Sequence, residues 1–394
     1  MKLSKRISAV GDSATIAITA MARRMQADGI DLVSFGAGEP DFDTPDFIRD
    51  AAKAALDAGD TKYTPQSGRR LQQAIAEKLA RENGLQCEPD QIIVTFGGKH
   101  ALYDAFQAAL DPGEKVLLPG PYWNSYPEQI RLAGGEPVVL PTTLDDGWKI
   151  TPEQILGAAD GAKIILINSP SNPTGATYTP RQLAALAQAI LKTDLTVFSD
   201  EVYEKLVYDG TEFVSFASLD ERLPPRTVTF NSLSKTASMP GWRIGWAAGP
   251  RELIAAMGRL RSHETTNPVS FVQAAALAAY TDGRTPETIE SMRREFERRA
   301  AHMHERLSAM PGVRCAKPTG ALYCFPDVSA HYGRSFGGVK ASDSSRFAEA
   351  ALKQAQVALV PGAAFGADNC VRLCFAMSMA DIDKGLDRLE KMLR

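Results

Sequence analysis

Seven short apolar runs, separated by segments with a helical pattern, constrain the fold of this chain more than any other feature of its sequence. The runs lie between residues 92 and 248, and apolar and polar residues do not alternate within them. Strands of this kind are buried on both faces, as in a mostly parallel sheet covered by helices. The expected strands are Ile92–Phe96, Lys115–Leu118, Pro137–Leu140, Ile164–Ile167, Thr196–Phe198, Thr227–Phe230 and Ile244–Ala248. The sequence therefore predicts an α/β fold, with helices such as Leu71–Arg81, Ala101–Leu110 and Pro180–Leu191 between the strands.

The last third of the chain predicts a further structural unit. At 394 residues the chain exceeds the size at which one hydrophobic core stops growing. Pro286–Met310 has the pattern of one long charged helix, which we expect to bridge into a second domain. Beyond it, Ala321–Phe325 and Val371–Phe375 predict strands of that domain, and Ala380–Leu393 predicts a terminal helix.

Composition and charge exclude several classes of protein. A formal net charge of -3 without a basic tract offers no surface for nucleic acid. No run of about 18 apolar residues occurs, so no membrane span is expected. Gly11 interrupts the apolar stretch that a signal peptide would need after its basic start. The five cysteines are odd in number and lack a Cys-x-x-Cys pair, which indicates reduced thiols in the cytoplasm and no metal site.

Polar motifs follow five of the expected strands, each just past the point where the strand ends. They are Gly97-Gly98-Lys99, Pro121-Tyr122-Trp123, Asn172-Pro173-Thr174-Gly175, the pair Asp200 and Tyr203, and Ser232-Leu233-Ser234-Lys235. In an open α/β sheet, ligands bind outside the carboxyl ends of the strands. We therefore expect these motifs to converge on one site, which favours an enzyme.

The spacing of these motifs carries a family resemblance. Arg243 follows Lys235 by eight residues, and the segments Gly38–Pro45 and Thr61–Tyr63 fit the same pattern. As a set, the motifs resemble those of the fold-type I, class I aminotransferases over nearly the whole chain. The resemblance implies pyridoxal 5′-phosphate (PLP) as cofactor, an amino acid and a 2-oxo acid as substrates, and a homodimer with shared active sites. It also implies a large domain over residues 45–290 with a seven-stranded sheet, and a smaller α/β domain formed by residues 1–44 and 291–394.

The resemblance assigns the covalent chemistry of the cofactor to Lys235. Its amine would hold PLP as a Schiff base and, once released, would move a proton as base and acid. Asp200 would pair with the pyridine nitrogen, so that the ring stays cationic and accepts electrons; a helix N-cap is its alternative role. Tyr203 and Asn172 would bond the phenolic oxygen, with core packing as an equal alternative for Tyr203. The Asn172–Pro173 bond resembles one that is cis in the family.

Cationic and N–H donors are implied around the cofactor phosphate. Arg243 would supply a guanidinium fork, and Ser232 and Ser234 would supply hydroxyl groups. The backbone N–H groups of Gly98 and Lys99 would face the phosphate from the N-terminus of a helix.

Two aromatic residues complete the implied cofactor site. Tyr63 matches a tyrosine whose hydroxyl group reaches the phosphate from the partner subunit, and an ordinary half-exposed tyrosine is the alternative. Trp123 resembles the aromatic residue that stacks on the cofactor ring, and a place in the core is the alternative for this side chain.

The substrate α-carboxylate is assigned to Arg372, which stands in Val371-Arg372-Leu373. A guanidinium binds a carboxylate through two parallel hydrogen bonds and so fixes the orientation of the α-hydrogen. Gly38 would add a backbone N–H, and Trp123 and Asn172 would also contact the substrate. A buried structural ion pair is the alternative for Arg372.

The substrate side chain is assigned to a lysine. Lys99, with Ser13, Thr15 and Ser262 around it, resembles a branch of aspartate aminotransferases in which a lysine binds the distal carboxylate. We therefore expect aspartate and glutamate as amino donors, with 2-oxoglutarate or oxaloacetate as acceptor. Because a lysine stem can swing away, prephenate or aromatic substrates are an alternative activity. The alternative for Lys99 is a position in solvent beside the phosphate.

Two further readings stay open from the sequence alone. A β-lyase or a decarboxylase uses the same kind of scaffold, because fold and cofactor do not fix the reaction. A regulatory PLP-binding domain without catalysis is the other, although no helix-turn-helix or basic region is appended to this sequence.

Overall fold

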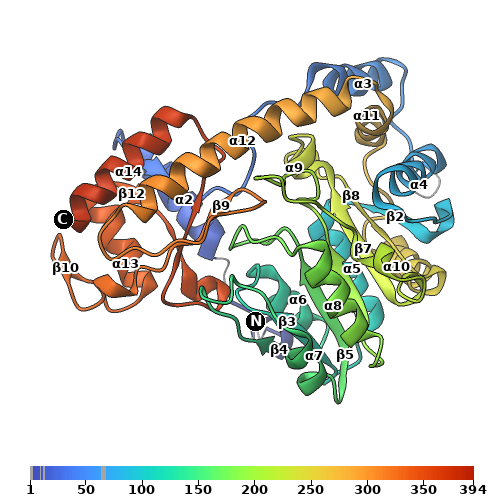
Figure 1. The fold of residues 1–394 in the computed structure, drawn as a ribbon. Helices are drawn as coiled ribbons and strands as arrows, with labels where there is room; N and C mark the ends of the chain where they lie inside the picture. The colour runs from blue at the N-terminus through green and yellow to red at the C-terminus, as the bar shows by residue number, and fades with distance from the viewer. Residues whose placement is uncertain (1–2, 9, 12–13, 64–67) are drawn as a thin grey trace.

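The computed structural model describes residues 3–8, 10–11, 14–63 and 68–394 of the chain. Figure 1 shows two lobes, of which one contains the large sheet and its flanking helices. The other contains the C-terminal strands together with α2 (Ala14–Ala27), α13 (Ser344–Ala350) and α14 (Met379–Leu393). The long helix α12 (Thr285–Ser308) runs from the first lobe into the second, as its charged pattern predicts.

The large sheet has seven strands in the order β2-β8-β7-β6-β5-β3-β4. Each strand coincides with one of the predicted apolar runs. They are β2 (Ile92–Thr95), β3 (Lys115–Pro119), β4 (Glu136–Leu140), β5 (Ala162–Asn168), β6 (Thr196–Asp200), β7 (Thr227–Ser232) and β8 (Gly245–Ala248). Within this sheet β8 is antiparallel to both of its neighbours and all other pairs are parallel. The prediction of a mostly parallel sheet is therefore confirmed.

Helices cover both faces of this sheet (Figure 1). Those of the large lobe are α3 (Asp46–Asp57), α4 (Arg69–Asn83), α5 (Gly98–Ala109), α6 (Ser125–Leu132), α7 (Pro152–Ala158), α8 (Pro180–Ile190), α9 (Leu233–Thr236), α10 (Arg251–Glu264) and α11 (Ser270–Thr281). The three helices predicted between the strands are present as α4, α5 and α8.

Strand β5 shows why the apolar runs do not alternate. Ile164 and Leu166 belong to the core cluster that also contains residues of α5, α6 and α10. Ile165 and Ile167 belong to the cluster formed with α7 and α8. Successive side chains of a strand point to opposite faces, and helices bury both faces here. Every position of the strand interior is therefore apolar.

The second lobe is built around a three-stranded antiparallel sheet in the order β13-β14-β9. Two of its strands, β9 (Tyr323–Cys324) and β14 (Val371–Cys374), lie within predicted strands, whereas β13 (Val360–Pro361) is not among them. A separate pair joins β1 (Val33–Ser34) in parallel to β12 (Val357–Ala358). The N-terminal segment thereby packs with the C-terminal part of the chain.

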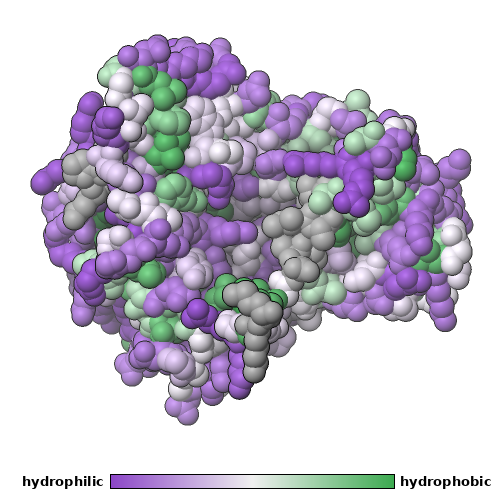
Figure 2. Space-filling view, turned by 180° about the vertical axis from the view of Figure 1, so that it is seen from behind, coloured by the Kyte–Doolittle hydropathy of each residue, from purple (hydrophilic) through white to green (hydrophobic). Residues whose placement is uncertain are grey.

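The surface view from behind is mainly hydrophilic (Figure 2). Hydrophobic side chains gather near its upper left, on the side where α3 and α11 lie. Leu56 in α3 and Val269, directly before α11, are exposed large apolar residues. Among the helices of the described residues, none combines the length and the apolar character needed to cross a membrane.

Candidate active site

A cavity of about 610 Å³ lies between the two lobes, at the carboxyl ends of the parallel strands. It is lined by residues from both lobes, including most of those singled out from the sequence. These are Gly38, Gly98, Lys99, Trp123, Asn172, Asp200, Tyr203, Ser232, Ser234, Lys235, Arg243 and Arg372. The fold therefore gathers motifs that are scattered over more than 300 residues of sequence into one place.

Two of the predicted site residues do not line this cavity, and two others fall on parts of the chain that the structure does not describe in full. Tyr63 has 85% of its surface exposed, and Ser262 is exposed on α10. Thr15 lies in α2, but its side chain is outside the part of the chain that the structure describes, and Ser13 lies wholly outside it. The resemblance assigns Tyr63 and Ser262 to the site of a partner subunit. Ser13 and Thr15 belong to the N-terminal segment. Their roles stay predictions.

Lys235 lies in the short helix α9, directly after the buried strand β7. Its Nζ donates a hydrogen bond to the backbone carbonyl of Gly38, which belongs to the N-terminal segment of the other lobe. Burial lowers the pKa of Lys235 to about 8, because a low-dielectric site disfavours the ammonium form. A substantial fraction of neutral amine is therefore present near neutral pH, which is what a nucleophile or a base requires.

Asp200 ends strand β6 and is buried. Tyr126 Oη donates to its Oδ2 at 2.7 Å, and the backbone N–H of Val202 donates to Oδ1 at 3.2 Å. Burial raises the pKa of Asp200 to about 6, although both hydrogen bonds oppose the shift. The carboxylate is thus mainly ionised at neutral pH. No helix begins directly after it, so its Oδ1 caps the turn at Val202 and not a helix.

Tyr203 lies in the core and also on the wall of the cavity. Its ring belongs to the core cluster of the second lobe. Its hydroxyl group lies 2.8 Å from that of Tyr323. Burial raises the pKa of Tyr203 well above its ordinary value, so this phenol stays neutral and keeps a proton that it can donate.

The start of α5 places several hydrogen-bond donors at one end of the cavity. Gly97, which precedes the helix, has φ +89°, and a Cβ there would lie 2.8 Å from Nη2 of Arg243. The Arg243 guanidinium also donates to the backbone carbonyl of Pro240 at 2.7 Å. Ser232 and Ser234 lie at the start of α9 beside it, on the wall of the same cavity. Backbone N–H groups, a guanidinium and hydroxyl groups are donors suited to a phosphate.

Arg372 is a buried cation without a carboxylate partner. Only 1% of its surface is exposed. It donates to Asn172 Oδ1 at 2.9 Å and to the carbonyl of Gly36 at 3.0 Å, while its Nε has no partner among the described residues. The guanidinium also lies over the rings of Tyr323 and Phe365, 4.4 and 5.0 Å from their centroids. It makes no ion pair with a described residue, so the alternative of a structural ion pair is not supported.

Lys99 provides a second cation on the cavity wall. Its Nζ lies 4.7 Å from the centroid of the Trp123 ring, a cation–π contact. Burial, followed by the charge of Arg243, lowers the pKa of Lys99. Trp123 packs edge-on against Tyr126, with ring centroids 5.3 Å apart. The indole therefore serves the core and the cavity together.

Sequence reasoning did not single out three residues that shape this site. Tyr126 donates to Asp200, and Tyr323 faces Tyr203. Asn168 donates to the backbone carbonyl of Asp200 at 3.0 Å. Asn168 carries a usable signal, because it ends β5 as Asp200 ends the neighbouring β6. The two tyrosines carry none, since nothing in their local sequence distinguishes them from core residues.

Comparison with known proteins identifies the family. Residues 30–389 match the family model described as aminotransferase class I and II. The chain is 46% identical over 395 residues to the aspartate aminotransferase of Geobacillus stearothermophilus, covering 100% of this chain and 99% of that protein. This chain belongs to the class I and II aminotransferases.

Two further relatives of this aminotransferase agree with the assignment. It is 46% identical over 378 residues to the aspartate/prephenate aminotransferase of Cereibacter sphaeroides, covering 95% of this chain and 94% of that protein. The solved aspartate aminotransferase of Thermus thermophilus with maleate has a TM-score of 0.94 to this chain at 42% identity, with 100% of both chains covered. The predicted fold, a fold-type I arrangement, is confirmed.

The cofactor of this aminotransferase family is PLP, and the groups around the cavity fit it. An amine of lowered pKa at Lys235 matches its aldehyde. Buried Asp200 matches its pyridine nitrogen. The cradle formed by Gly97, Gly98 and Arg243 matches its phosphate.

Proposed function

We propose that this aminotransferase transfers the amino group of L-aspartate to 2-oxoglutarate, giving oxaloacetate and L-glutamate. The observation that carries the proposal is the pair of cations, Arg372 and Lys99, on the wall of the cavity that contains Lys235. All four substrates and products carry two carboxylates. Buried Arg372 suits the α-carboxylate, since its Nε has no partner among the described residues. Lys99 then suits the distal carboxylate. Relatives named as aspartate aminotransferases support this choice.

The proposed mechanism assigns one task to each group. Bound PLP supplies an electrophilic carbon for the amino group and an electron-withdrawing ring. Asp200 keeps a negative charge opposite the ring nitrogen, and Tyr203 and Asn172 donate to the phenolic oxygen. Arg372 and the backbone N–H of Gly38 hold the α-carboxylate, which fixes the direction of the α-hydrogen. The released amine of Lys235 then takes that proton at Nζ and returns it.

The proposed phosphate contacts come from both the backbone and side chains. Gly98, Lys99, Ser232, Ser234 and Arg243 line the cavity, and their backbone N–H groups, hydroxyl groups and guanidinium would hold the phosphate. Trp123, on the same wall, would stack on the cofactor ring. These roles follow from the positions of the residues and from the resemblance of the motifs.

The assembly and location of the enzyme belong to the same proposal. We expect a cytoplasmic homodimer in which Tyr63 and Ser262 reach the active site of the partner subunit. The 85% exposure of Tyr63, outside the cavity of its own subunit, supports this arrangement. Residues 45–290 would form the cofactor domain, and residues 1–44 with 291–394 the smaller domain. The pairing of β1 with β12 supports this boundary.

Aspartate/prephenate transamination is the second candidate. A further cavity of about 640 Å³ adjoins the first, and both share Lys99 and Arg243 on their walls. Aromatic rings of Phe96, Tyr103 and Tyr122 line this second cavity. A substrate with a bulky ring fits there once the Lys99 stem turns aside. A relative at 46% identity carries this activity in its name.

Replacement of Lys99 by methionine tests the proposal. A charge-assisted hydrogen bond contributes about 1.5–3 kcal/mol. Lys99→Met should therefore lower kcat/KM for aspartate by roughly tenfold to a hundredfold, and for alanine much less. Steady-state assays that quantify both the 2-oxo acid and the amino acid product measure this and also exclude lyase or decarboxylase chemistry.

Lys115→Met is the matched control. Lys115 is an exposed lysine at the beginning of β3, the end of the sheet opposite the cavity. Lys115→Met should leave kcat/KM unchanged for both aspartate and alanine. Equal losses for aspartate and alanine in Lys99→Met would show that Lys99 serves the cofactor or the fold and does not bind the distal carboxylate.

A further inference from the structure

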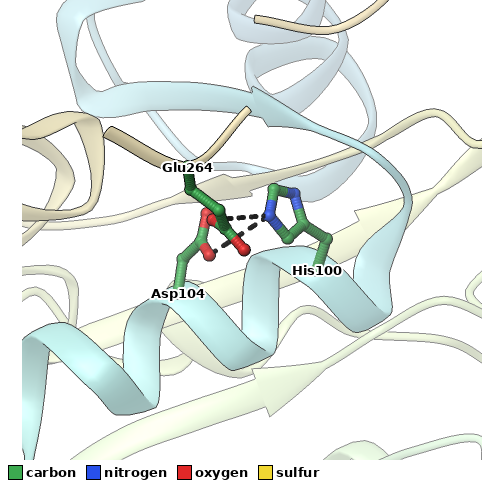
Figure 3. A group of neighbouring side chains, drawn as sticks. All are labelled: His100, Asp104 and Glu264. Carbon is green, nitrogen blue, oxygen red and sulfur yellow. Dashed lines mark hydrogen bonds and ion pairs between the residues drawn. The ribbon is translucent and has the colours of Figure 1, made fainter. Parts of the chain in front are cut away.

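Three ionisable side chains meet near the start of α5, outside the residues assigned so far (Figure 3). His100 and Asp104 lie one turn apart on α5, and Glu264 is the last residue of α10. His100 Nε2 lies 3.0 Å from Glu264 Oε2 and 3.4 Å from Asp104 Oδ1. The three side chains point toward one another, so they form one cluster that joins the two helices.

One imidazole and two carboxylates are suitable ligands for a divalent cation. The tautomer of His100, however, opposes metal binding. Its Nδ1 accepts the backbone N–H of Phe96 at 3.3 Å. In the neutral ring the proton therefore sits on Nε2. A metal-binding histidine needs the reverse, with a lone pair toward the metal and the other N–H donated to a neighbour. His100 Nε2–H is instead placed to donate to Glu264, with Asp104 beside it.

Asp104 is the fully buried member of the cluster. The residue has 0% of its surface exposed, and neither carboxylate oxygen has a hydrogen-bond partner of normal geometry among the described residues. Burial, with Glu264 beside it, raises the pKa of Asp104 to about 8. The Asp104 carboxyl group is therefore largely protonated at neutral pH and can donate to Glu264.

The cluster is connected on each side to a segment that carries a proposed substrate contact. On α5, His100 directly follows Lys99. On α10, Glu264 lies two residues after Ser262. Buried Arg261, one residue before Ser262 on α10, donates from Nη1 to the carbonyl of Val94 in β2 at 2.6 Å. The last turn of α10 is thus fixed to β2 and, through the cluster, to the first turns of α5.

We propose that His100 is a positioning residue, whose Nε2–H bond to Glu264, beside Asp104, sets the place of Lys99 and Ser262 and thereby the affinity for the distal carboxylate. This inference rests on the proposed function, in which Lys99 binds that carboxylate. His100 itself touches neither substrate nor cofactor. Its effect is confined to dicarboxylates, because the α-carboxylate and the α-hydrogen are held by residues outside the cluster.

Two replacements of His100 separate its two hydrogen bonds. Glutamine places an amide N–H near the position of Nε2, whereas asparagine places an acceptor near Nδ1 and cannot reach the carboxylates. His100→Asn should raise KM for aspartate and Kd for succinate about tenfold, with kcat and the alanine reaction changed less than about twofold. His100→Gln should restore both constants to near the wild-type values. Steady-state kinetics measure the first constant, and calorimetric titration with succinate measures the second without turnover.

Each outcome decides the inference. Equal effects of the asparagine and glutamine variants, or equal losses for aspartate and alanine, overturn it. If His100→Asn does not fold, Glu264→Ala takes its place in the test, because it removes the same contact from the exposed side. An aspartate-specific loss in Lys99→Met without one in His100→Asn refutes only this inference. Absence of that loss in Lys99→Met refutes the proposed function itself.

Discussion

The two ends of the catalytic cavity differ in how the chain builds them. At the inner end, Lys235, Asp200 and Arg372 are held by the ends of strands or by the short helix after one, and Asp200 and Arg372 are almost fully buried. At the outer end, Lys99 and Ser262 are exposed. Described residues of one chain supply the inner end, whereas the proposed outer end also needs Ser13 and Thr15 and a second subunit.

This difference has an electrostatic consequence. Burial moves the pKa of Lys235 down to about 8 and that of Asp200 up to about 6, which prepares both groups for proton transfer and charge stabilisation. Exposed charges at the outer end are screened by water and salt, so each contributes less. Chemistry is therefore fixed by the inner end, and substrate preference can change through few residues at the outer end.

The largest effect is expected from Lys235→Ala, at the inner end. The substitution removes the proposed nucleophile and the proposed base together, so kcat should fall by about 10⁴-fold or more. Stopped assays with aspartate and 2-oxoglutarate measure the loss. Borohydride reduction of the wild-type holoenzyme, followed by peptide mapping, should find the cofactor on Lys235. Label on another lysine would overturn the assignment.

A mixing experiment with the same variant tests whether the partner subunit completes the outer end. A subunit with Lys235→Ala still carries Tyr63, and a subunit with Tyr63→Ala still carries Lys235. After denaturation and joint refolding, half of the dimers are hybrids with one complete site, so activity should approach about a quarter of wild type. Sedimentation checks the dimer. Activity equal to the mean of the two separate variants would show that the sites are not shared.

The inner end and the fold around it could be predicted from sequence because their signals are local. Apolar runs without alternation indicate strands buried on both faces, and all seven of the large sheet were placed to within two residues. Asp200 and Lys235 stand directly after such runs. Within the second lobe, β13 was not predicted: residues 357–361 form one apolar run, which the fold divides between β12 and β13 in two different sheets.

The rest depends on contacts that no local pattern encodes. Tyr126 lies 74 positions from Asp200, and Tyr323 lies 120 positions from Tyr203. Only the folded sheet brings each pair together. Likewise, the cluster of His100 and Glu264 joins residues 164 positions apart. Tyr63 and Ser262 could be named only by resemblance, because their proposed partners belong to another subunit.

A smaller effect is expected from removal of the charge opposite the cofactor ring. Asp200→Ala removes a buried carboxylate that would stabilise charge during removal of the α-proton, so this step should slow by about 10²–10³-fold. Cofactor should still bind through Lys235 and Arg243, which spectrophotometric titration checks. Asp200→Asn is the control that retains volume without charge. Near-wild-type rates in either variant would contradict the role of the carboxylate and the contrast between the two ends.

The smallest effect is expected from Tyr126→Phe, which leaves every proposed reacting group in place. Tyr126 donates to the ionised form of Asp200 and therefore lowers its pKa. Without that hydrogen bond, the effect of burial on Asp200 is less opposed and the pKa of Asp200 rises. The acid limb of kcat/KM against pH should therefore move up by about one pH unit. At pH 8 and above the variant should approach wild type. Tyr178→Phe is the control, because the Tyr178 hydroxyl accepts from Ile150 in a core cluster without contact to Asp200; it should lower stability but leave the acid limb in place. An unchanged or downward-shifted limb in Tyr126→Phe would show that the inner end does not depend on this contact to keep Asp200 ionised.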